Sequence, residues 1–125
     1  MNKVGTDIVE VDRIRKLIDK YDFKFLTKIF TPEEIEYCNS HRDPSIHFAG
    51  RFSAKEAILK VLSGKYENMH FKFNEINIIN DKNGRPYIDD RYLPVKMQYH
   101  KLHNIDISIS HTSTHAISVA ILNNA

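Results

Sequence analysis

The sequence is poor in the residues that mark several common protein classes. It contains one cysteine, four glycines and four prolines in 125 residues. A single cysteine, Cys38, forms no disulfide within the chain and excludes a zinc site built from several cysteines. The low glycine and proline content argues against a collagen-like or low-complexity chain, and no glycine-rich dinucleotide-binding motif is present. No apolar run approaches the roughly 18 residues of a membrane-spanning helix, so we expect no membrane association.

An excess of charge of one sign is also missing. The formal net charge is +2 at pH 7, which is too small to indicate nucleic-acid binding by itself. The first residues lack the apolar core of a secretion signal. The length suits one domain over residues 1–125 with a modest core. We therefore expect a cytoplasmic protein of one domain that does not bind nucleic acid.

The hydrophobic pattern switches between helical and strand periodicity and predicts an α+β fold, with small antiparallel sheets packed on helices. The expected strands cover residues 3–9, 73–80, 86–88, 105–110 and 116–122. The expected helices cover residues 10–20, 23–30, 32–41, 44–62 and 92–102. Thr31, Pro32 and Glu34 form a strong helix start, and Asn83-Gly84 is a strong turn signal.

The long helix over residues 44–62 carries charged side chains in an apolar setting. On a helical wheel, Arg51 and Lys55 fall within or beside the bulky apolar sector. Glu56 and Lys60 lie one turn apart on another side. A buried charge must be paired or must bind something charged. The alternative is an ordinary i,i+4 pair between Glu56 and Lys60 on an exposed helix.

Asp7 interrupts an apolar strand directly before the first helix. Its carboxylate either caps that helix or binds a hard metal ion. Mg²⁺ typically takes one or two protein carboxylates and completes its coordination with water and substrate phosphate. Asp7 together with Glu56 would meet that requirement.

The strand over residues 105–110 ends in a polar segment. Alternation places Ile107, Ile109 and His111 on one face, and Ser110 and Thr112 on the other. Hydroxyl and imidazole groups at a strand end offer donors to a phosphate or a base edge. The alternative is ordinary turn chemistry in a hairpin, where such residues are common.

Four segments resemble the motifs of bacterial holo-acyl-carrier-protein synthases, a family of the 4'-phosphopantetheinyl transferase superfamily. They are residues 5–14 (GTDIVEVDRI), 48–60 (FAGRFSAKEAILK), 81–86 (DKNGRP) and 109–112 (ISHT). Their order and spacing follow the family and span almost the whole chain. Any one of them alone would be a weak signal, but the four together are specific.

The resemblance implies a reaction and an assembly. The reaction is transfer of 4'-phosphopantetheine from coenzyme A to a serine of apo acyl carrier protein, with release of adenosine 3',5'-bisphosphate, in fatty acid biosynthesis. The assembly is a homotrimer of small α+β subunits with active sites at the subunit interfaces. By motif, Asp7 and Glu56 bind Mg²⁺, and Glu56 and Lys60 act in catalysis. The coenzyme A-binding residues implied are Arg51, Lys55, Asn83, Gly84, Arg85, Pro86, Ser110, His111 and Thr112.

The chain departs from the family pattern in three places. Residues 63–70 are longer than the usual short glycine-rich turn and contain one glycine, Gly64. Arg85 stands where the family has lysine, which keeps the charge but changes its geometry. The segment between Tyr87 and Ile105 is also longer than usual.

Two other functions stay open on the sequence. One is a different enzyme of the same superfamily, acting on a carrier domain of a larger synthase. The other is a non-catalytic module that binds coenzyme A or phosphate, which the lengthened loop over residues 63–70 would favour if it blocked the site.

The first helix carries a basic face opposite its apolar stripe. Arg13, Lys16 and Lys20 share one side of the helix. The residues expected to face inward are Val11, Ile14, Ile18 and Tyr21. The basic face is either solvated surface or a docking face for the acyl carrier protein, which in this family of reactions is strongly acidic around its acceptor serine.

Overall fold

The computed structural model describes residues 2–63, 71–91 and 102–123. Its strands are β1 (Lys3–Glu10), β2 (Asn77–Asn80), β3 (Pro86–Asp89), β4 (Ile105–His111) and β5 (His115–Leu122). Its α-helices are α1 (Val11–Tyr21), α2 (Phe23–Ile29), α3 (Pro32–Asn39) and α4 (Pro44–Ser63). Two short 3₁₀ turns are η1 (Phe73–Glu75) and η2 (Leu102–Asn104). Among the described helices, none combines the length and apolar character that crossing a bilayer requires.

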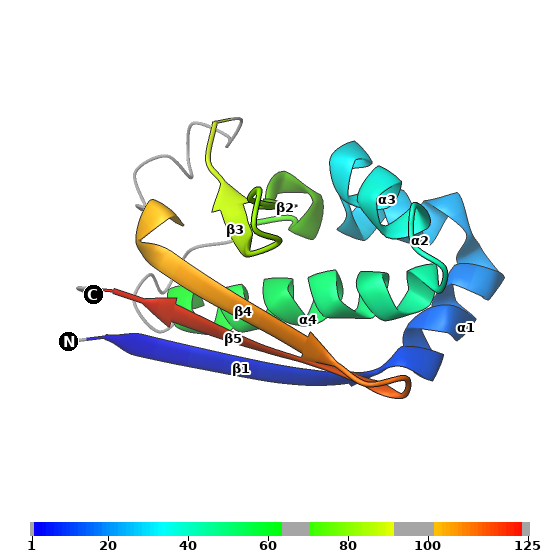
Figure 1. Ribbon diagram of the computed structural model, residues 1–125, viewed down its shortest axis with the longest axis horizontal. Coiled ribbons are helices and arrows are strands. Elements are labelled where there is room, and N and C mark those ends of the chain that lie inside the picture. Colours follow the sequence, from blue (N-terminus) through cyan, green and yellow to red (C-terminus); the bar gives the residue numbers. More distant parts are fainter. Residues whose placement is uncertain (1, 64–70, 92–101, 124–125) are drawn as a thin grey trace.

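A three-stranded antiparallel sheet in the order β1-β5-β4 is the base of the fold. Helix α4 runs along one face of this sheet, and the β2–β3 hairpin and α3 lie on the other side of α4 (Figure 1). The α+β class predicted from the sequence is confirmed. Because α4 is covered from several sides, its core residues Ala54, Ala57, Ile58 and Leu62 are completely buried.

Strand β1 approaches α4 unusually closely at Gly5. A Cβ atom at this position would lie 2.4 Å from the carbonyl oxygen of Ala57, so glycine is required for the contact. Asp7 follows two residues later on β1, and Glu56 precedes Ala57 on α4. The close contact at Gly5 therefore brings the two acidic residues to the same edge of the fold.

The β2–β3 hairpin is closed by a tightly bonded turn over residues 81–85. The Asp81 carboxylate accepts hydrogen bonds from the backbone N–H groups of Asn83 at 2.8 Å and Arg85 at 3.0 Å. Gly84 has a φ angle of 84°, a conformation that glycine adopts without strain. The Asn83-Gly84 turn signal in the sequence is thus confirmed.

The face of the three-stranded sheet turned away from α4 is exposed and apolar. Val4 and Ile8 on β1 are 63% and 64% exposed, and Ile117 on β5 is 45% exposed. Ile8 and Ile117 are register partners, and Ser110 on β4 is the partner of Ile117 on its other side. Three large apolar side chains in water on one sheet face are a feature of surfaces that a partner covers.

Three details of the sequence-based expectation are wrong. The segment 73–76 is not part of a strand, because the Glu75 carboxylate accepts the backbone N–H of Lys72 at 2.7 Å and closes a 3₁₀ turn. Tyr21, expected to face inward, ends α1 and is 45% exposed. Helix α3 ends at Asn39 instead of His41. The expected helix over residues 92–102 lies almost wholly outside the described residues.

Candidate active site

Asp7, Glu56 and Lys60 form one polar group at the β1 edge of the sheet, which we call the carboxylate cluster. The Lys60 ammonium donates to the backbone carbonyl of Thr6 at 2.7 Å and lies 3.6 Å from a carboxylate oxygen of Asp7. On α4 the Ser53 hydroxyl donates to the backbone carbonyl of Asp7 at 3.1 Å. The backbone next to Asp7 is therefore held to α4 at two points.

The two acidic side chains of the carboxylate cluster influence each other. Burial raises the pKa of Glu56, and the nearby Asp7 carboxylate raises that pKa further, while Lys60 and Arg13 oppose the shift. Two like charges held together disfavour each other's ionised form, and Lys60, 3.6 Å from Asp7, offsets this only in part. Within the described ranges, no group of three or more His, Cys, Asp or Glu side chains could hold a metal ion. The carboxylates of Asp7 and Glu56 nevertheless suit Mg²⁺, which needs few protein ligands.

A second group of residues lines a cavity of about 170 Å³ at the opposite, β4 edge of the sheet, which we call the Arg51 cavity. Its lining residues are Tyr37, Ile46, His47, Gly50, Arg51, Asn80, Gly84, Pro86, Ile109 and His111. Four of these, Arg51, Gly84, Pro86 and His111, are residues that the family motifs implied for coenzyme A. They come from α4, the hairpin and β4, so only the tertiary fold brings them together.

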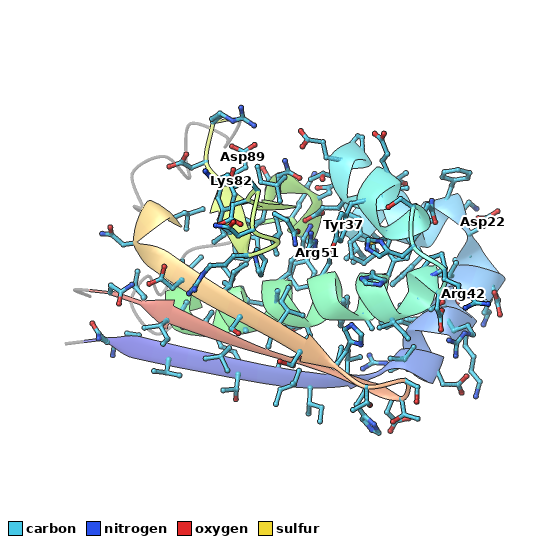
Figure 2. All side chains as sticks on the ribbon, in the orientation of Figure 1. Asp22, Tyr37, Arg42, Arg51, Lys82 and Asp89 are labelled. Atoms are coloured by element: carbon cyan, nitrogen blue, oxygen red, sulfur yellow. The ribbon has the colours of Figure 1, made fainter. Side chains whose placement is uncertain are left out.

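Arg51 is the central charge of this cavity. Its side chain rises from α4 toward α3, where the guanidinium lies 4.4 Å from the centre of the Tyr37 ring (Figure 2). One of its terminal N–H groups donates to the Asn80 side-chain oxygen. The Nε atom is buried and has no hydrogen-bond partner among the described residues. A buried, incompletely paired cation beside an open cavity is a ready contact for an anionic ligand.

Three histidines extend the aromatic wall of the Arg51 cavity. The rings of His41 and His47 stack with their centres 3.7 Å apart, and His111 meets His47 edge-on at 5.6 Å. Burial lowers the pKa of His47 to about 4, helped by His41, His111 and Arg51. His47 is therefore uncharged at neutral pH and adds a flat aromatic surface instead of a charge. The sequence reasoning missed His47, Tyr37 and Asn80, because none of them belongs to a recognised motif.

Lys55 is buried and does not line the Arg51 cavity. Its ammonium is completely buried and donates to Glu34 at 2.6 Å, to the Ile29 carbonyl at 2.9 Å and to the Phe73 carbonyl at 2.8 Å. Burial lowers the pKa of Lys55, and the Glu34 carboxylate opposes this. All three N–H donors of the ammonium are thus in use within the subunit, and a contact between Lys55 and coenzyme A stays a prediction. The sequence reasoning treated Glu34 only as part of a helix start.

Several other residues implied for coenzyme A lie outside the Arg51 cavity. Ser110 points to the exposed sheet face because strand alternation separates it from His111. The Thr112 hydroxyl accepts the backbone N–H groups of Thr114 and His115 in the β4–β5 turn. Asn83 and Arg85 are exposed in the hairpin turn. Within one chain, these four residues do not join the cavity, and contacts from them to a ligand stay predictions.

The basic residues of α1 line a cleft next to the carboxylate cluster. A cavity of about 690 Å³ is bordered by Arg13, Lys16 and Lys20 together with parts of β1. Arg13 acts electrostatically on Glu56, so this cleft and the carboxylate cluster are neighbours. The Lys16 ammonium pairs with Asp12 at 3.0 Å on the exposed surface.

Within one chain the carboxylate cluster and the Arg51 cavity lie on different sides of α4 and at different edges of the sheet. Arg51 and Glu56 are five residues apart on α4, which turns their side chains about 140° from each other. Asp7 is on β1 and His111 on β4, the two outer strands of the sheet. Each edge of the subunit therefore carries part of a polar site.

The chain has clear relatives. Residues 3–121 match the model of the 4'-phosphopantetheinyl transferase superfamily. The chain belongs to this superfamily. It is 46% identical over 119 residues to the holo-[acyl-carrier-protein] synthase of Thermoanaerobacter sp. (strain X514), covering 94% of this chain and 84% of that protein. The crystal structure of the Neisseria meningitidis holo-[acyl-carrier-protein] synthase matches with a TM-score of 0.81 at 27% identity over 97% of each chain.

A ligand-bound relative is also similar. The Helicobacter pylori holo-[acyl-carrier-protein] synthase in complex with coenzyme A matches with a TM-score of 0.76 at 32% identity, covering 94% of this chain and 97% of that chain. Membership of the 4'-phosphopantetheinyl transferase superfamily confirms the resemblance indicated by the four motifs. Of the departures from the family pattern, residues 64–70 and most of the segment between Tyr87 and Ile105 lie outside the described residues.

Proposed function

We propose that this chain transfers the 4'-phosphopantetheine group from coenzyme A to a serine of apo acyl carrier protein and releases adenosine 3',5'-bisphosphate. The observation that carries the proposal is the carboxylate cluster, in which Asp7, Glu56 and Lys60 meet. The neighbouring cleft is lined by the basic residues of α1 together with Glu10 and Asp12. Superfamily membership and the names of the relatives support the same reaction. The reaction prepares the carrier for fatty acid biosynthesis, and we propose that it takes place in the cytoplasm.

Asp7 and Glu56 would hold Mg²⁺, supplying the carboxylate oxygens that this ion prefers. When bound, Mg²⁺ neutralises charge that develops on the pyrophosphate oxygens. Lys60 is positioned by Thr6 and Asp7 to place its ammonium against the same phosphates. Its charge stabilises the leaving phosphate. This contribution is electrostatic, because phosphoryl transfer asks a protein mainly for positioning and charge neutralisation.

Glu56 is also the group best suited to accept the proton of the attacking serine. It lies beside Asp7 and Lys60, where a carboxylate oxygen that is not bound to the ion could reach the serine hydroxyl. The serine Oγ attacks the β-phosphorus that carries pantetheine, and its proton passes to a Glu56 carboxylate oxygen. The bond from that phosphorus to the bridging oxygen breaks, and adenosine 3',5'-bisphosphate leaves.

The nucleotide part of coenzyme A would occupy the Arg51 cavity. Arg51 supplies a fixed positive charge, and Tyr37, His47 and Pro86 supply flat apolar surface for a base. Uncharged His47 suits such a role, since it avoids repelling Arg51. The pantetheine phosphate would then lie near the carboxylate cluster of another subunit.

A homotrimer would complete the site. Each subunit carries the carboxylate cluster on the β1 edge and the Arg51 cavity on the β4 edge, so neighbouring copies in a closed ring would bring the two together. The exposed apolar face with Val4, Ile8 and Ile117 gives such a ring a surface to bury. The basic side of α1 would receive the acidic carrier protein next to the serine-accepting residues.

One mass measurement tests the proposal. The chain is incubated with coenzyme A, Mg²⁺ and apo acyl carrier protein, and the carrier is weighed. We expect the carrier to gain roughly 340 Da, the mass of the transferred arm. A carrier of unchanged mass, with coenzyme A still bound by the chain, would identify a binding module without transferase activity.

A further inference from the structure

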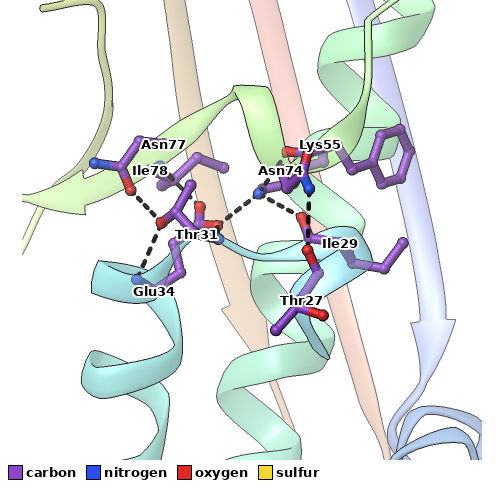
Figure 3. A network of polar contacts seen from close by, with 9 residues as sticks. Thr27, Ile29, Thr31, Glu34, Lys55, Asn74, Asn77 and Ile78 are labelled. Atoms are coloured by element: carbon purple, nitrogen blue, oxygen red, sulfur yellow. Dashed lines mark hydrogen bonds and ion pairs between the residues drawn. The ribbon is translucent and has the colours of Figure 1, made fainter. Parts of the chain in front are cut away.

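A buried polar group with many hydrogen bonds lies outside the carboxylate cluster and the Arg51 cavity. It is the ion pair between Glu34 on α3 and Lys55 on α4, with both side chains fully buried and a separation of 2.6 Å. Figure 3 shows how several segments converge on this pair. Lys55 binds the carbonyls of Ile29 and Phe73 as well as Glu34.

Both oxygens of the Glu34 carboxylate accept hydrogen bonds from other segments. One oxygen accepts from Lys55 and from the backbone N–H of Thr31 at 2.8 Å. The other accepts the backbone N–H of Ile78 on β2, also at 2.8 Å. A second link joins the same segments, because the Thr31 hydroxyl donates to the Asn77 side chain at 2.6 Å. Strand β2 is thus fastened to the start of α3 at two successive residues.

Strand β2 leads directly from this anchor to the Arg51 cavity. Asn80 is two residues beyond Ile78, a step of about 6.6 Å along an extended strand. Its side-chain oxygen accepts from Arg51, and its side-chain nitrogen donates to the Gly84 carbonyl at 2.9 Å. A shift of β2 would therefore move Asn80 and, with it, Arg51 and Gly84, which both line the cavity.

We propose that Glu34 is a positioning residue for nucleotide binding, acting through β2 and Asn80 on Arg51 and Gly84. This proposal rests on the transferase function proposed above. A buried ion pair is weak support for stability, since its desolvation offsets most of its attraction. Its value here is geometric, because the pair fixes the distance between α3, α4 and the hairpin that carries three of the ten residues lining the cavity. Neither partner touches the ligand.

The proposal is tested by measuring the nucleotide Kd of variants whose folded fraction is known. Glu34→Gln removes the carboxylate. Thr31→Val removes the hydroxyl that holds Asn77 and caps α3, and it is a second variant to test if Glu34→Gln does not fold. We expect each to raise the Kd for adenosine 3',5'-bisphosphate about tenfold or more, measured by calorimetry well below its Tm. The KM for coenzyme A should rise with it, while kcat at saturating coenzyme A stays within about threefold of the wild type.

Two controls separate positioning from stability. Leu122→Ala removes a buried apolar side chain of β5 that forms none of the hydrogen bonds of this network, and it should lower the Tm without changing the Kd. In the double variant Glu34→Gln with Asn80→Ala, the Kd should be no higher than in Asn80→Ala alone, because both changes act through Asn80. Additive effects, or a wild-type Kd in both Glu34→Gln and Thr31→Val, would overturn the proposal. A wild type that binds nucleotide but transfers nothing would instead refute the proposed function.

Discussion

Burial of Glu56 and the neighbouring charge of Asp7 together raise the pKa of Glu56, because β1 and α4 hold the two carboxylates at one edge of the sheet. The close contact of β1 with α4 at Gly5 imposes this arrangement. Holding two like charges close together lowers the stability of a protein. Such a pair is therefore a candidate functional site, where the carboxylates bind a cation or accept a proton.

Removing either carboxylate should abolish transfer without unfolding the protein. We expect Asp7→Asn and Glu56→Gln each to lower kcat/KM by about 100-fold or more, since Mg²⁺ loses one of its few protein ligands. The circular dichroism spectrum should match that of the wild type, and thermal unfolding should stay cooperative. Wild-type kcat in either variant at ordinary Mg²⁺ would refute the metal assignment. Chelation with EDTA should stop the wild-type reaction, and added Mg²⁺ should restore it.

The raised pKa of Glu56 predicts the pH dependence of stability in the absence of metal. The folded state binds the Glu56 proton more tightly than the unfolded state, so this residue stabilises the fold at low pH. That contribution is lost as the pH rises from the ordinary glutamate value through the raised one. Between about pH 4 and 8 in EDTA, the Tm of the wild type should therefore fall relative to that of Glu56→Gln.

Mg²⁺ should reverse this difference, because the ion favours the ionised carboxylate. The Tm increase on adding Mg²⁺ should be larger at the high end of the pH range than at the low end, and absent in Glu56→Gln. Parallel Tm curves for the two proteins in EDTA would show that Glu56 has no raised pKa.

The exposed apolar sheet face predicts the assembly. We expect the wild type to scatter light with three times the subunit mass of 14.6 kDa. The double variant Val4→Arg with Ile117→Arg places two charges on the face that the ring would bury and should produce monomers. The monomers should be folded but inactive, because the carboxylate cluster and the Arg51 cavity are then separated.

A matched control for this assembly experiment changes surface charge elsewhere. Glu36→Arg on α3 is exposed and lies away from the sheet face, so it should leave mass and activity unchanged. A wild type that is monomeric and fully active would refute both the trimer and the shared site.

The basic side of α1 should act on the carrier protein and not on coenzyme A. Arg13→Glu with Lys16→Glu should raise the KM for the carrier far more than the KM for coenzyme A. Added salt should weaken the wild type more than this variant, because the variant has already lost the screened attraction. Since Arg13 also acts on Glu56, Lys16→Glu with Lys20→Glu serves as a second pair farther from the carboxylates. Equal effects on both substrates would show that this side of α1 is only solvated surface.

Structural features that depend on neighbouring residues could be predicted from the sequence. The Thr31 cap, the Asn83-Gly84 turn and the alternation of β4 each depend on neighbours within a few residues, so these elements could be placed without a fold. The four motifs also identified the superfamily. Asp7, Glu56 and Lys60 could be named from the motifs, but the sequence spacing did not show that they meet.

The tertiary structure decided which of two adjacent charges is buried. Lys55 and Glu56 are neighbours on α4, and the sequence offered both as ligand contacts, but a step of about 100° around the helix turns Lys55 into the core against Glu34 and leaves Glu56 at the sheet edge. The partners of Lys55 come from α2, α3 and η1, and those of Arg51 from α3 and β2. Such contacts join residues far apart in the chain, and they depend on how α3 and the hairpin pack on α4, which no local pattern encodes.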